Sequence, residues 1–335
     1  MKDSPLLSII LIIIFIITII YNNKIYIIII FLLHYKQNVP WYSESSFSKE
    51  KIPLKYINWM SYIKDSTDIR EMSIPGTHDS STYQFKGYFL FYKNFISQTQ
   101  SWKIEDQLMC GIRYFDLRPS GNGIIYHGDH ETLYSLNSIF QIFQNFLFKY
   151  NTECLIVRIQ FQYKNCNGDI EGSKERGIYN ILDKYNDIIY NNNEVPNMGK
   201  IRGKIYLILE RLKYKGYIIW DENDILEIQD YYRFWGIRKY EIDKKINLVK
   251  DFMYNNNKEK LIINHCSAIG RGVLTTLKYV AYSVNKLPFQ EKGFRGIFAF
   301  DFPGEELIKH VINQNTNYFK NEFFENNTNV IYKLE

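Results

Sequence analysis

The 335-residue chain contains few cysteines and no dense block of positive charge. Its four cysteines show no CxxC spacing, which argues against a zinc site. The 41 basic and 36 acidic residues are interspersed and leave a net charge of only +5. Nucleic-acid-binding proteins concentrate their basic residues in patches. We therefore expect no nucleic-acid partner, and we interpret the charges as a solvated surface.

The chain also lacks a glycine-rich phosphate-binding loop after its first expected strand, which a doubly wound dinucleotide-binding sheet would carry. From about residue 68, short apolar runs end in polar residues, and amphipathic stretches lie between them. The expected strands are 70–75, 111–117, 124–126, 154–160, 204–211, 261–265 and 296–301. The expected helices are 136–150, 173–190, 241–254, 274–285 and 305–315. This alternation predicts an α/β fold with a mainly parallel sheet, and polar side chains at several strand ends favour a TIM barrel over a doubly wound sheet.

The N-terminal region is the one long apolar stretch. Residues 6–33 are nearly all apolar, interrupted only by Asn-Asn-Lys at 22–24, and are long enough to span a bilayer. No small-residue cleavage site follows them, so we favour an uncleaved signal-anchor over a cleaved signal peptide. A buried helix is the third reading, which the lack of any polar face disfavours. We assign 1–34 to this segment, 35–67 to a tether and 68–335 to the barrel, and expect membrane association, or secretion if the segment is cleaved.

Two histidines follow apolar strands and lie near charged residues. His78 comes after a Pro-Gly turn, and His127 ends the short apolar run 124–126. Asp116 and Arg118 are two residues apart, so on a strand they point to the same side. Each feature has a structural alternative: a lone histidine is usually structural, Asp116 and Arg118 can form a simple ion pair, and Asp301 can cap the helix after it.

Taken together, these residues suit substitution at phosphorus. One imidazole can take a proton from the attacking hydroxyl, and the other can give one to the leaving oxygen. The planar guanidinium of Arg118 can hold the non-bridging phosphate oxygens. A calcium or magnesium site would need several oxygen ligands, and an arginine beside Asp116 would repel the cation. The residues therefore favour chemistry without a metal.

Three segments carry a resemblance to a known family. Residues 73–80 (SIPGTHDS), 111–118 (GIRYFDLR) and 126–128 (YHG) resemble the X-region signature of phosphatidylinositol-specific phospholipases C, in particular the bacterial, metal-independent branch. Residues 229–232, 262–267 and 300–302 have counterparts in the same order. The likeness covers about residues 70–315 and leaves the N-terminal segment and tether outside.

The resemblance implies a distorted TIM barrel that cleaves phosphatidylinositol, or a glycosylphosphatidylinositol anchor, to diacylglycerol and inositol 1,2-cyclic phosphate. By position, His78 would be the general base on the inositol 2-hydroxyl, His127 the acid toward the diacylglycerol oxygen, and Arg118 the group that stabilises the phosphate. Asp301 would orient His78, and Asp79 would orient His127. Asp116 would hold Arg118 in place. The inositol pocket would be lined by Gln160, Arg211, Asp230 and Tyr232.

No cofactor or metal is implied, because the calcium-using branch carries an acidic residue at the position of Arg118 and an asparagine at that of Asp79. Bacterial relatives carry a lysine where this chain has Gln160. The expected partners are the lipid substrate and the membrane surface, which the aromatic residues of 83–95 suit, and we expect a monomer.

Two other functions stay open: a catalytically silent, membrane-tethered phosphoinositide-binding module and a metal-dependent glycerophosphodiester phosphodiesterase.

Overall fold

The computed structural model describes residues 52–88, 90–162, 175–221, 224–234, 238–270, 276–286, 292–321 and 331–332. The apolar segment 6–33, on which the expected membrane anchor depends, lies outside these ranges. Within them, no helix combines the length and the apolar character needed to cross a bilayer.

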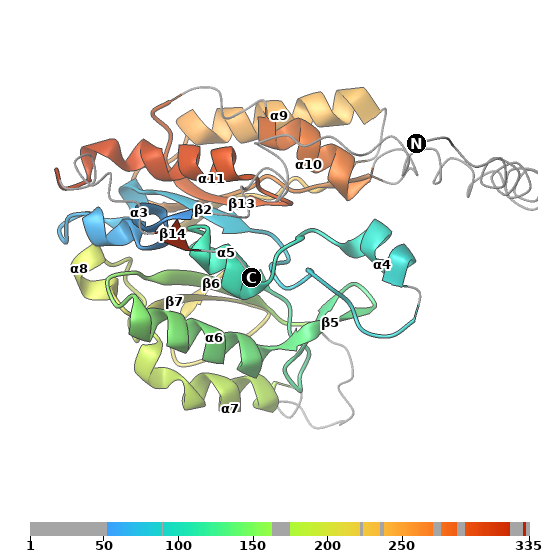
Figure 1. Ribbon diagram of the computed structural model, residues 1–335, viewed down its shortest axis with the longest axis horizontal. Coiled ribbons are helices and arrows are strands. Elements are labelled where there is room, and N and C mark those ends of the chain that lie inside the picture. The colour runs from blue at the N-terminus through green and yellow to red at the C-terminus, as the bar shows by residue number, and fades with distance from the viewer. Residues whose placement is uncertain are drawn as a thin grey trace, which may run out of the picture.

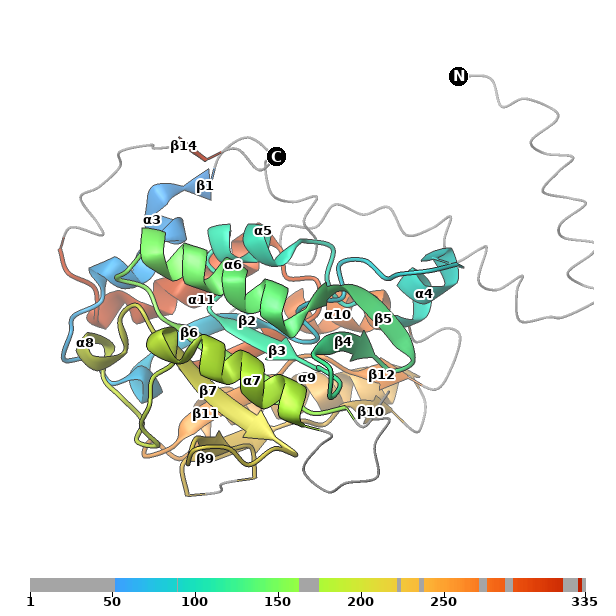
Figure 2. The same cartoon turned by 90° about the horizontal axis from the view of Figure 1, so that it is seen from below.

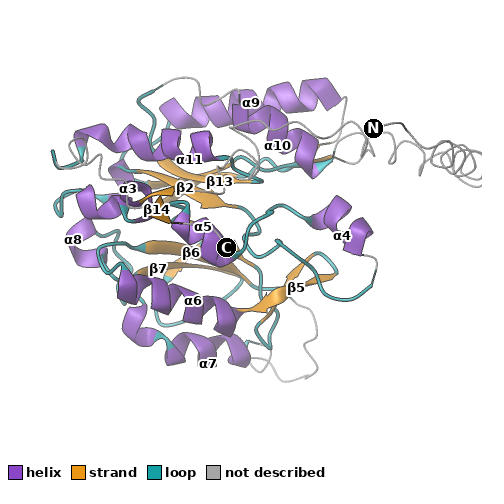
Figure 3. Cartoon of the chain, in the orientation of Figure 1, coloured by secondary structure: helices purple, strands orange, loops and turns teal. Residues whose placement is uncertain are grey.

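An eight-stranded parallel sheet forms the centre of the molecule (Figure 3). Its strands are β2 (Ser73–Thr77), β3 (Tyr114–Leu117), β6 (Leu155–Gln160), β7 (Ile205–Glu210), β8 (Ile218–Ile219), β9 (Leu226–Gln229), β11 (Leu261–His265) and β13 (Gly296–Phe300). Their order is β8-β7-β6-β3-β2-β13-β11-β9, so β13 pairs with β2 and the strands follow one another around a barrel that stays open between β8 and β9. The expected mainly parallel α/β sheet is confirmed, and the opening makes the barrel a distorted one.

The described helices lie around and beside this sheet (Figures 1 and 2). They are α3 (Leu54–Ile57), α4 (Leu90–Ser97), α5 (Ile104–Met109), α6 (Leu136–Lys149), α7 (Arg176–Lys184), α8 (Met198–Ile201), α9 (Arg238–Tyr254), α10 (Leu277–Lys286) and α11 (Glu305–Ile312). In Figure 1, α9, α10 and α11 lie on one side of the sheet and α6 and α7 on the other. Single 3-10 turns occur at Trp59–Tyr62, Ile69–Glu71, Asn186–Ile188 and Asn313–Asn317.

Apolar side chains on both faces explain why these strands pair as a buried parallel sheet. Every residue of β2, β3, β7, β11 and β13 is buried. A sheet that is covered on one face by helices and fills its own interior on the other needs such continuous apolar runs. The folded body begins before residue 68, because Ile57, Trp59 and Ile63 are completely buried and the Trp59 indole donates to the Gly111 carbonyl at 3.0 Å. It therefore includes the end of the segment that we assign to the tether.

The segment around His127 differs from its expected place. Residues 124–126 belong to β4 (Ile124–His127), which pairs antiparallel with β5 (His130–Ser135) in a separate hairpin outside the sheet. This hairpin and α4 lie together at one end of the molecule (Figures 1 and 2). Smaller pairs complete the fold: β1 (Ile52–Pro53) with β14 (Ile331–Tyr332), and β10 (Arg233–Phe234) with β12 (Ile269–Gly270).

Candidate active site

His78 directly follows β2, and its two ring nitrogens have different partners. Nδ1 lies 2.8 Å from Asp301 Oδ1, and Nε2 lies 2.8 Å from Arg118 Nη2. Because a guanidinium can only donate, Nε2 accepts that hydrogen bond and Nδ1 carries the proton that Asp301 accepts. Buried Asp301 directly follows β13 and has no role in capping that the hydrogen bonds show, so the alternative of a helix cap is not supported. In this arrangement the ring is the Nδ1–H tautomer, and the lone pair of Nε2 is directed to Arg118 Nη2.

His127, at the end of β4, has a different partner at each ring nitrogen. Its Nδ1 lies 2.6 Å from the carbonyl oxygen of Ser97, the last residue of α4. This contact assigns the Nδ1 proton and leaves Nε2 to face Asp79, 3.2 Å from Oδ2. His78 Nε2 lies 3.3 Å from the same oxygen. Both Nε2 atoms therefore lie beside Asp79 Oδ2, and the two rings are 6.4 Å apart between centroids and nearly perpendicular.

Asp79 contacts more groups than the sequence suggests. In addition to both histidines, its Oδ1 lies 2.7 Å from Arg118 Nε. The residue has a positive φ of 43°, a left-handed conformation that aspartate tolerates better than most residues. This backbone kink places the carboxylate beneath all three of the other groups. The expected contact with His127 is present, and Asp79 also holds Arg118.

Arg118 is fixed by acids on both of its edges. Its Nη2 lies 3.1 Å from Asp116 Oδ2, while Nε contacts Asp79. Burial acts to lower the pKa of the Arg118 guanidinium, but the charges of Asp79 and Asp116 outweigh it and raise that pKa above its ordinary value. Arg118 is therefore a permanent positive charge with a fixed orientation. Asp116 lies beside Arg118, where the resemblance places it.

Arg158 is a member of this network that sequence reasoning missed. It lies within β6, 2% exposed, with its Nη1 3.4 Å from Asp116 Oδ1 and its Nε 3.0 Å from Glu210 Oε2. Burial alone would raise the pKa of Asp116, but Arg158 and Arg118 together lower it well below its ordinary value. A charged residue in the middle of the otherwise apolar run 155–159 is the signal that could have identified Arg158.

The solvent exposure of these groups divides them by role. The side chains of His78, His127 and Arg118 are 14%, 18% and 19% exposed. The carboxylates of Asp79, Asp116 and Asp301 beneath them are 2% exposed or less. The three groups that would have to touch a substrate are therefore the three that solvent reaches, and the carboxylates act through them.

Electrostatics prepares His78 to accept a proton. Burial acts to lower the pKa of His78, but the charges of Asp79 and Asp301 and the hydrogen bond to Asp301 outweigh it and raise the pKa above 6.5. When Nε2 takes up a proton, Asp79 Oδ2 at 3.3 Å faces the new N–H. Protonated His78 thus faces a carboxylate at each nitrogen, and these carboxylates outweigh the opposing charge of Arg118, whose Nη2 lies 2.8 Å from Nε2.

The residues predicted for the inositol pocket lie at neighbouring strand ends. Gln160 ends β6 and donates from Nε2 to Glu210 Oε1 at 2.6 Å. Arg211 follows β7 with a positive φ of 60°, and its half-exposed side chain lies 3.7 Å from Glu210. Asp230 and Tyr232 follow β9, and Tyr232 is 46% exposed. Burial acts to raise the pKa of Asp230, but positive groups around the site, Arg158 among them, lower it below its ordinary value.

Two aromatic residues complete the wall of the site, and neither was predicted. The Trp220 ring lies against Arg158, with the guanidinium carbon 3.7 Å from the ring centroid. Trp220 also makes an edge contact with His265 at 5.7 Å, and His265 makes one with His78 at 5.7 Å. Burial lowers the pKa of His265 to about 3, so this imidazole is neutral and packs against His78 without competing for its proton.

A metal ion could in principle bind where His78, Asp79 and Asp116 converge. One ligand atom from each lies within 4.8 Å of the other two. Arg118, however, contacts all three, with distances of 2.8 Å to His78, 2.7 Å to Asp79 and 3.1 Å to Asp116. The guanidinium thus takes the place and supplies the charge of a cation, and the residues present fit a metal poorly.

A parallel α/β barrel with paired histidines, each oriented by its own partner, and a fixed arginine defines an enzyme site for acid–base chemistry at a phosphodiester. Comparison with known proteins agrees. Residues 72–211 match the family described as phosphatidylinositol-specific phospholipase C, X domain. The 1-phosphatidylinositol phosphodiesterase of Listeria monocytogenes is 30% identical over 279 residues, which cover 77% of this chain and 84% of that protein.

Two further comparisons extend the match. The 1-phosphatidylinositol phosphodiesterase of Staphylococcus aureus strain Newman is 24% identical over 315 residues, covering 82% of this chain and 99% of that protein. The solved structure of phosphatidylinositol-specific phospholipase C from Listeria monocytogenes superposes with a TM-score of 0.68 at 27% identity, covering 79% of this chain and 99% of that one. The chain belongs to the phosphatidylinositol-specific phospholipase C family, and both the expected family and the expected TIM-like fold are confirmed.

Proposed function

We propose that this chain is a phosphatidylinositol diacylglycerol-lyase, which cleaves phosphatidylinositol or a glycosylphosphatidylinositol anchor to diacylglycerol and inositol 1,2-cyclic phosphate. The observation that carries this function is the convergence of His78 Nε2 and His127 Nε2 on one space beside Arg118. The relatives named 1-phosphatidylinositol phosphodiesterase support the reaction class. All of these groups come from one chain, which supports action as a monomer.

The first step is attack at phosphorus. His78 Nε2 takes the proton of the inositol 2-hydroxyl while that oxygen forms the new bond to phosphorus. Asp301, 2.8 Å from Nδ1, stabilises the imidazolium that results. Arg118 supports the negative charge that builds on the non-bridging oxygens, because its orientation is already set by Asp79 and Asp116.

The second step is departure of diacylglycerol. His127 starts protonated on both nitrogens, with its Nε2 proton facing Asp79 and its Nδ1 proton on the Ser97 carbonyl. It gives the Nε2 proton to the glycerol oxygen as the bond from phosphorus to that oxygen breaks. The cycle ends with His78 protonated and His127 neutral, and exchange with water restores the starting state.

The other two functions fit the site less well. A silent binding module would not require both histidines to be held in their tautomers by separate partners, as His78 is by Asp301 and His127 by Ser97. A metal-dependent glycerophosphodiesterase would need the position that Arg118 takes among His78, Asp79 and Asp116.

Incubation of the purified full-length chain with headgroup-labelled phosphatidylinositol tests the function directly. We expect cyclic inositol phosphate as the first product, at the same rate in excess chelator and with added calcium, because Arg118 supplies the positive charge. Chromatography of the water-soluble products measures both. Activity that chelator abolishes and metal restores would support the metal-dependent alternative, and a chain that binds the lipid without turnover would support the silent one.

We further propose that the enzyme works at a membrane surface. Residues 1–34 would anchor it, or direct its secretion if cleaved, and the part of 35–67 that precedes the buried Ile57 would link the anchor to the barrel. Support comes from the exposed apolar side chains Tyr88, Leu90 and Leu133, which are 88%, 38% and 47% exposed. They lie on or beside α4 and the β4–β5 hairpin, the elements that also hold His127. Phe89 and the side chain of Phe91, two further candidates for membrane contact, lie outside the described part of the chain.

In the form that lacks residues 1–34, replacing Tyr88 and Leu90 with serine should weaken vesicle binding about 30-fold, since about 2 kcal/mol of apolar burial would be lost. Turnover of a water-soluble inositol phosphodiester should be unchanged. Sedimentation with phosphatidylcholine vesicles measures the binding. Phe148→Ser is a matched control, because this 89%-exposed ring lies near the C-terminal end of α6, far along that helix from the hairpin. Equal losses in the control and the double variant would contradict a localised membrane surface.

A further inference from the structure

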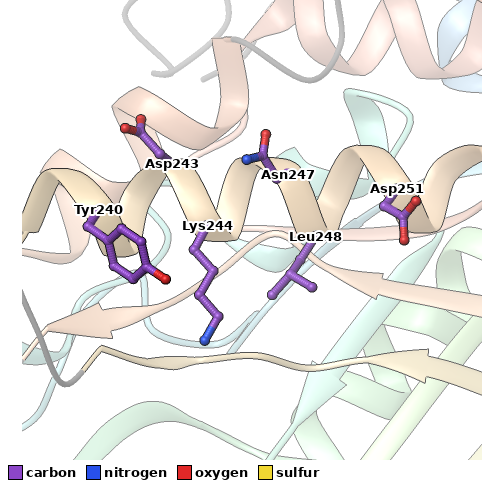
Figure 4. A pocket seen from close by; sticks show the side chains of 6 residues that line it. All are labelled: Tyr240, Asp243, Lys244, Asn247, Leu248 and Asp251. Carbon is purple, nitrogen blue, oxygen red and sulfur yellow. The ribbon is translucent and has the colours of Figure 1, made fainter.

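A lysine is buried behind the substrate pocket, where the mechanism does not use it. Lys245 lies on α9, which also presents an exposed face to solvent. A shallow hollow on that outer face (Figure 4) is lined by Tyr240, Asp243, Lys244, Asn247, Leu248 and Asp251. Lys245 is not part of it and is completely buried. A buried ammonium group is costly unless the protein satisfies its protons, so its partners indicate what it does.

The partners of Lys245 are oxygens of the segment that follows β9. Nζ donates to the Tyr231 carbonyl at 2.7 Å and to Gln229 Oε1 at 3.2 Å. Among the described residues, no carboxylate lies within ion-pair distance of Nζ. The charge is thus solvated by the oxygens of segment 229–231 rather than neutralised by an acid.

Gln229 connects this segment to the neighbouring strand end. Its Oε1 also accepts the Tyr231 backbone N–H at 2.8 Å. Its Nε2 donates to Asn264 Oδ1 at 2.7 Å and to the His265 carbonyl at 3.0 Å. Through Lys245, a buried hydrogen-bond network therefore joins α9 to the ends of β9 and β11.

The residues on either side of Tyr231 are the two that the resemblance assigns to the inositol pocket. The Tyr231 hydroxyl donates to Glu241 on α9 at 2.6 Å, so this side chain is directed to the helix. Burial acts to raise the pKa of Asp230, but the charges of His265, Arg158 and His78 lower it. Tyr232 is half exposed, and its carbonyl accepts the Ile269 N–H at 2.7 Å.

We propose that Lys245 is a positioning residue that holds segment 229–232 and so fixes Asp230 and Tyr232 for binding of the inositol headgroup. This inference rests on the proposed function, because it assumes that Asp230 and Tyr232 line the substrate pocket. The Tyr231 carbonyl, which accepts the hydrogen bond from Lys245, lies in the backbone between Asp230 and Tyr232. Loss of that bond loosens the pocket wall and leaves the histidines, held by Asp301 and Ser97, in place.

The same contact makes substrate binding sensitive to alkaline pH. Burial lowers the pKa of Lys245 to about 8, against the opposing influence of Cys266, Asp230 and Asp301 from the facing strand ends. On its own helix, Glu241 lies one turn earlier, and Asp243 lies two residues earlier on the exposed face. The ammonium form predominates below pH 8, so the charge-assisted contact is complete at pH 7. Above pH 8 the neutral amine keeps two N–H donors but loses its charge, and the contact weakens. KM should rise over that range while kcat changes little.

The test compares four full-length proteins on monomeric short-chain phosphatidylinositol between pH 6.5 and 9.5. In the wild type, KM should rise about tenfold toward pH 9.5. Lys245→Met should have a KM about tenfold higher at pH 7, independent of pH, with kcat within about threefold. Lys245→Arg, which keeps its charge, should retain a low KM to pH 9.5. Lys239→Met removes an exposed charge from the same helix and should behave as the wild type.

The outcomes separate the two proposals. A wild type that cleaves no phosphatidylinositol overturns the proposed function and this inference with it. A wild type that cleaves it, with Lys245→Met showing the same KM and pH profile, overturns only the role of Lys245. If Lys245→Met lowers kcat and the melting temperature but leaves KM unchanged, Lys245 is merely structural, and its positioning role is overturned. If Lys245→Met does not fold, the Lys245→Arg profile decides, and an alkaline rise in KM like that of the wild type is the contrary result.

Discussion

Replacing His127 with alanine should slow cleavage of natural phosphatidylinositol about 10³- to 10⁴-fold, the upper part of the range for loss of a general acid. The glycerol alkoxide is a poor leaving group and needs a proton, which His127 Nε2 supplies in the proposed mechanism. In a phosphodiester whose leaving group is a nitrophenol, that group departs as the phenolate without protonation. Cleavage of this substrate should therefore slow only about tenfold. The difference between the two substrates is the expected signature of the acid.

Steady-state kcat/KM on both substrates measures this difference. His310→Ala is a suitable control, because this histidine lies on α11 and contacts Gln314 rather than the catalytic groups. It should leave both rates near those of the wild type. Equal losses for His127→Ala on the two substrates would mean that the ring contributes binding or placement of Asp79, and would contradict its role as the acid.

Replacing Arg118 with lysine should lower kcat on both substrates about 10³-fold, or about 4 kcal/mol of transition-state stabilisation. The charge is kept, but the planar fork is lost. Arg118 reaches Asp79 with Nε and both Asp116 and His78 with Nη2, and a single ammonium cannot hold these positions together. KM should change much less than kcat, because the charge that Arg118 meets develops mainly in the transition state.

Comparison of kcat, KM and melting temperature with those of Arg202→Lys tests this explanation. Arg202 also uses its whole fork, donating to the carbonyls of Met60, Thr152 and Ile63, but it lies in the segment before β7, away from the catalytic groups. We expect that variant to lose stability and keep its turnover. A kcat of Arg118→Lys near the wild-type value would show that the guanidinium does not stabilise the transition state.

The hairpin at His127 shows where local sequence patterns stop being informative. The run 124–126 is apolar and short, like the barrel strands, and periodicity alone does not distinguish a barrel strand from a hairpin. The backbone of β4 pairs with β5 rather than with β3, apart from an isolated bridge between Pro119 and Ile125. The prediction of His127 as a site residue did not depend on this, since either place leaves it at a strand end.

The local sequence by itself determined the strand–helix alternation, the parallel sheet, and the motifs that contain His78, Asp79, Asp116, Arg118 and His127, because apolar periodicity and short motifs are properties of neighbouring residues. Only the tertiary structure decided that Asp79 contacts both histidines and Arg118, that Arg158 and Trp220 lie against each other beside them, and that Lys245 is buried against the Tyr231 carbonyl. The hydrogen bond from His78 to Asp301 joins residues 223 positions apart. Such contacts form only when β13 pairs with β2, and no local pattern encodes which side chains then meet.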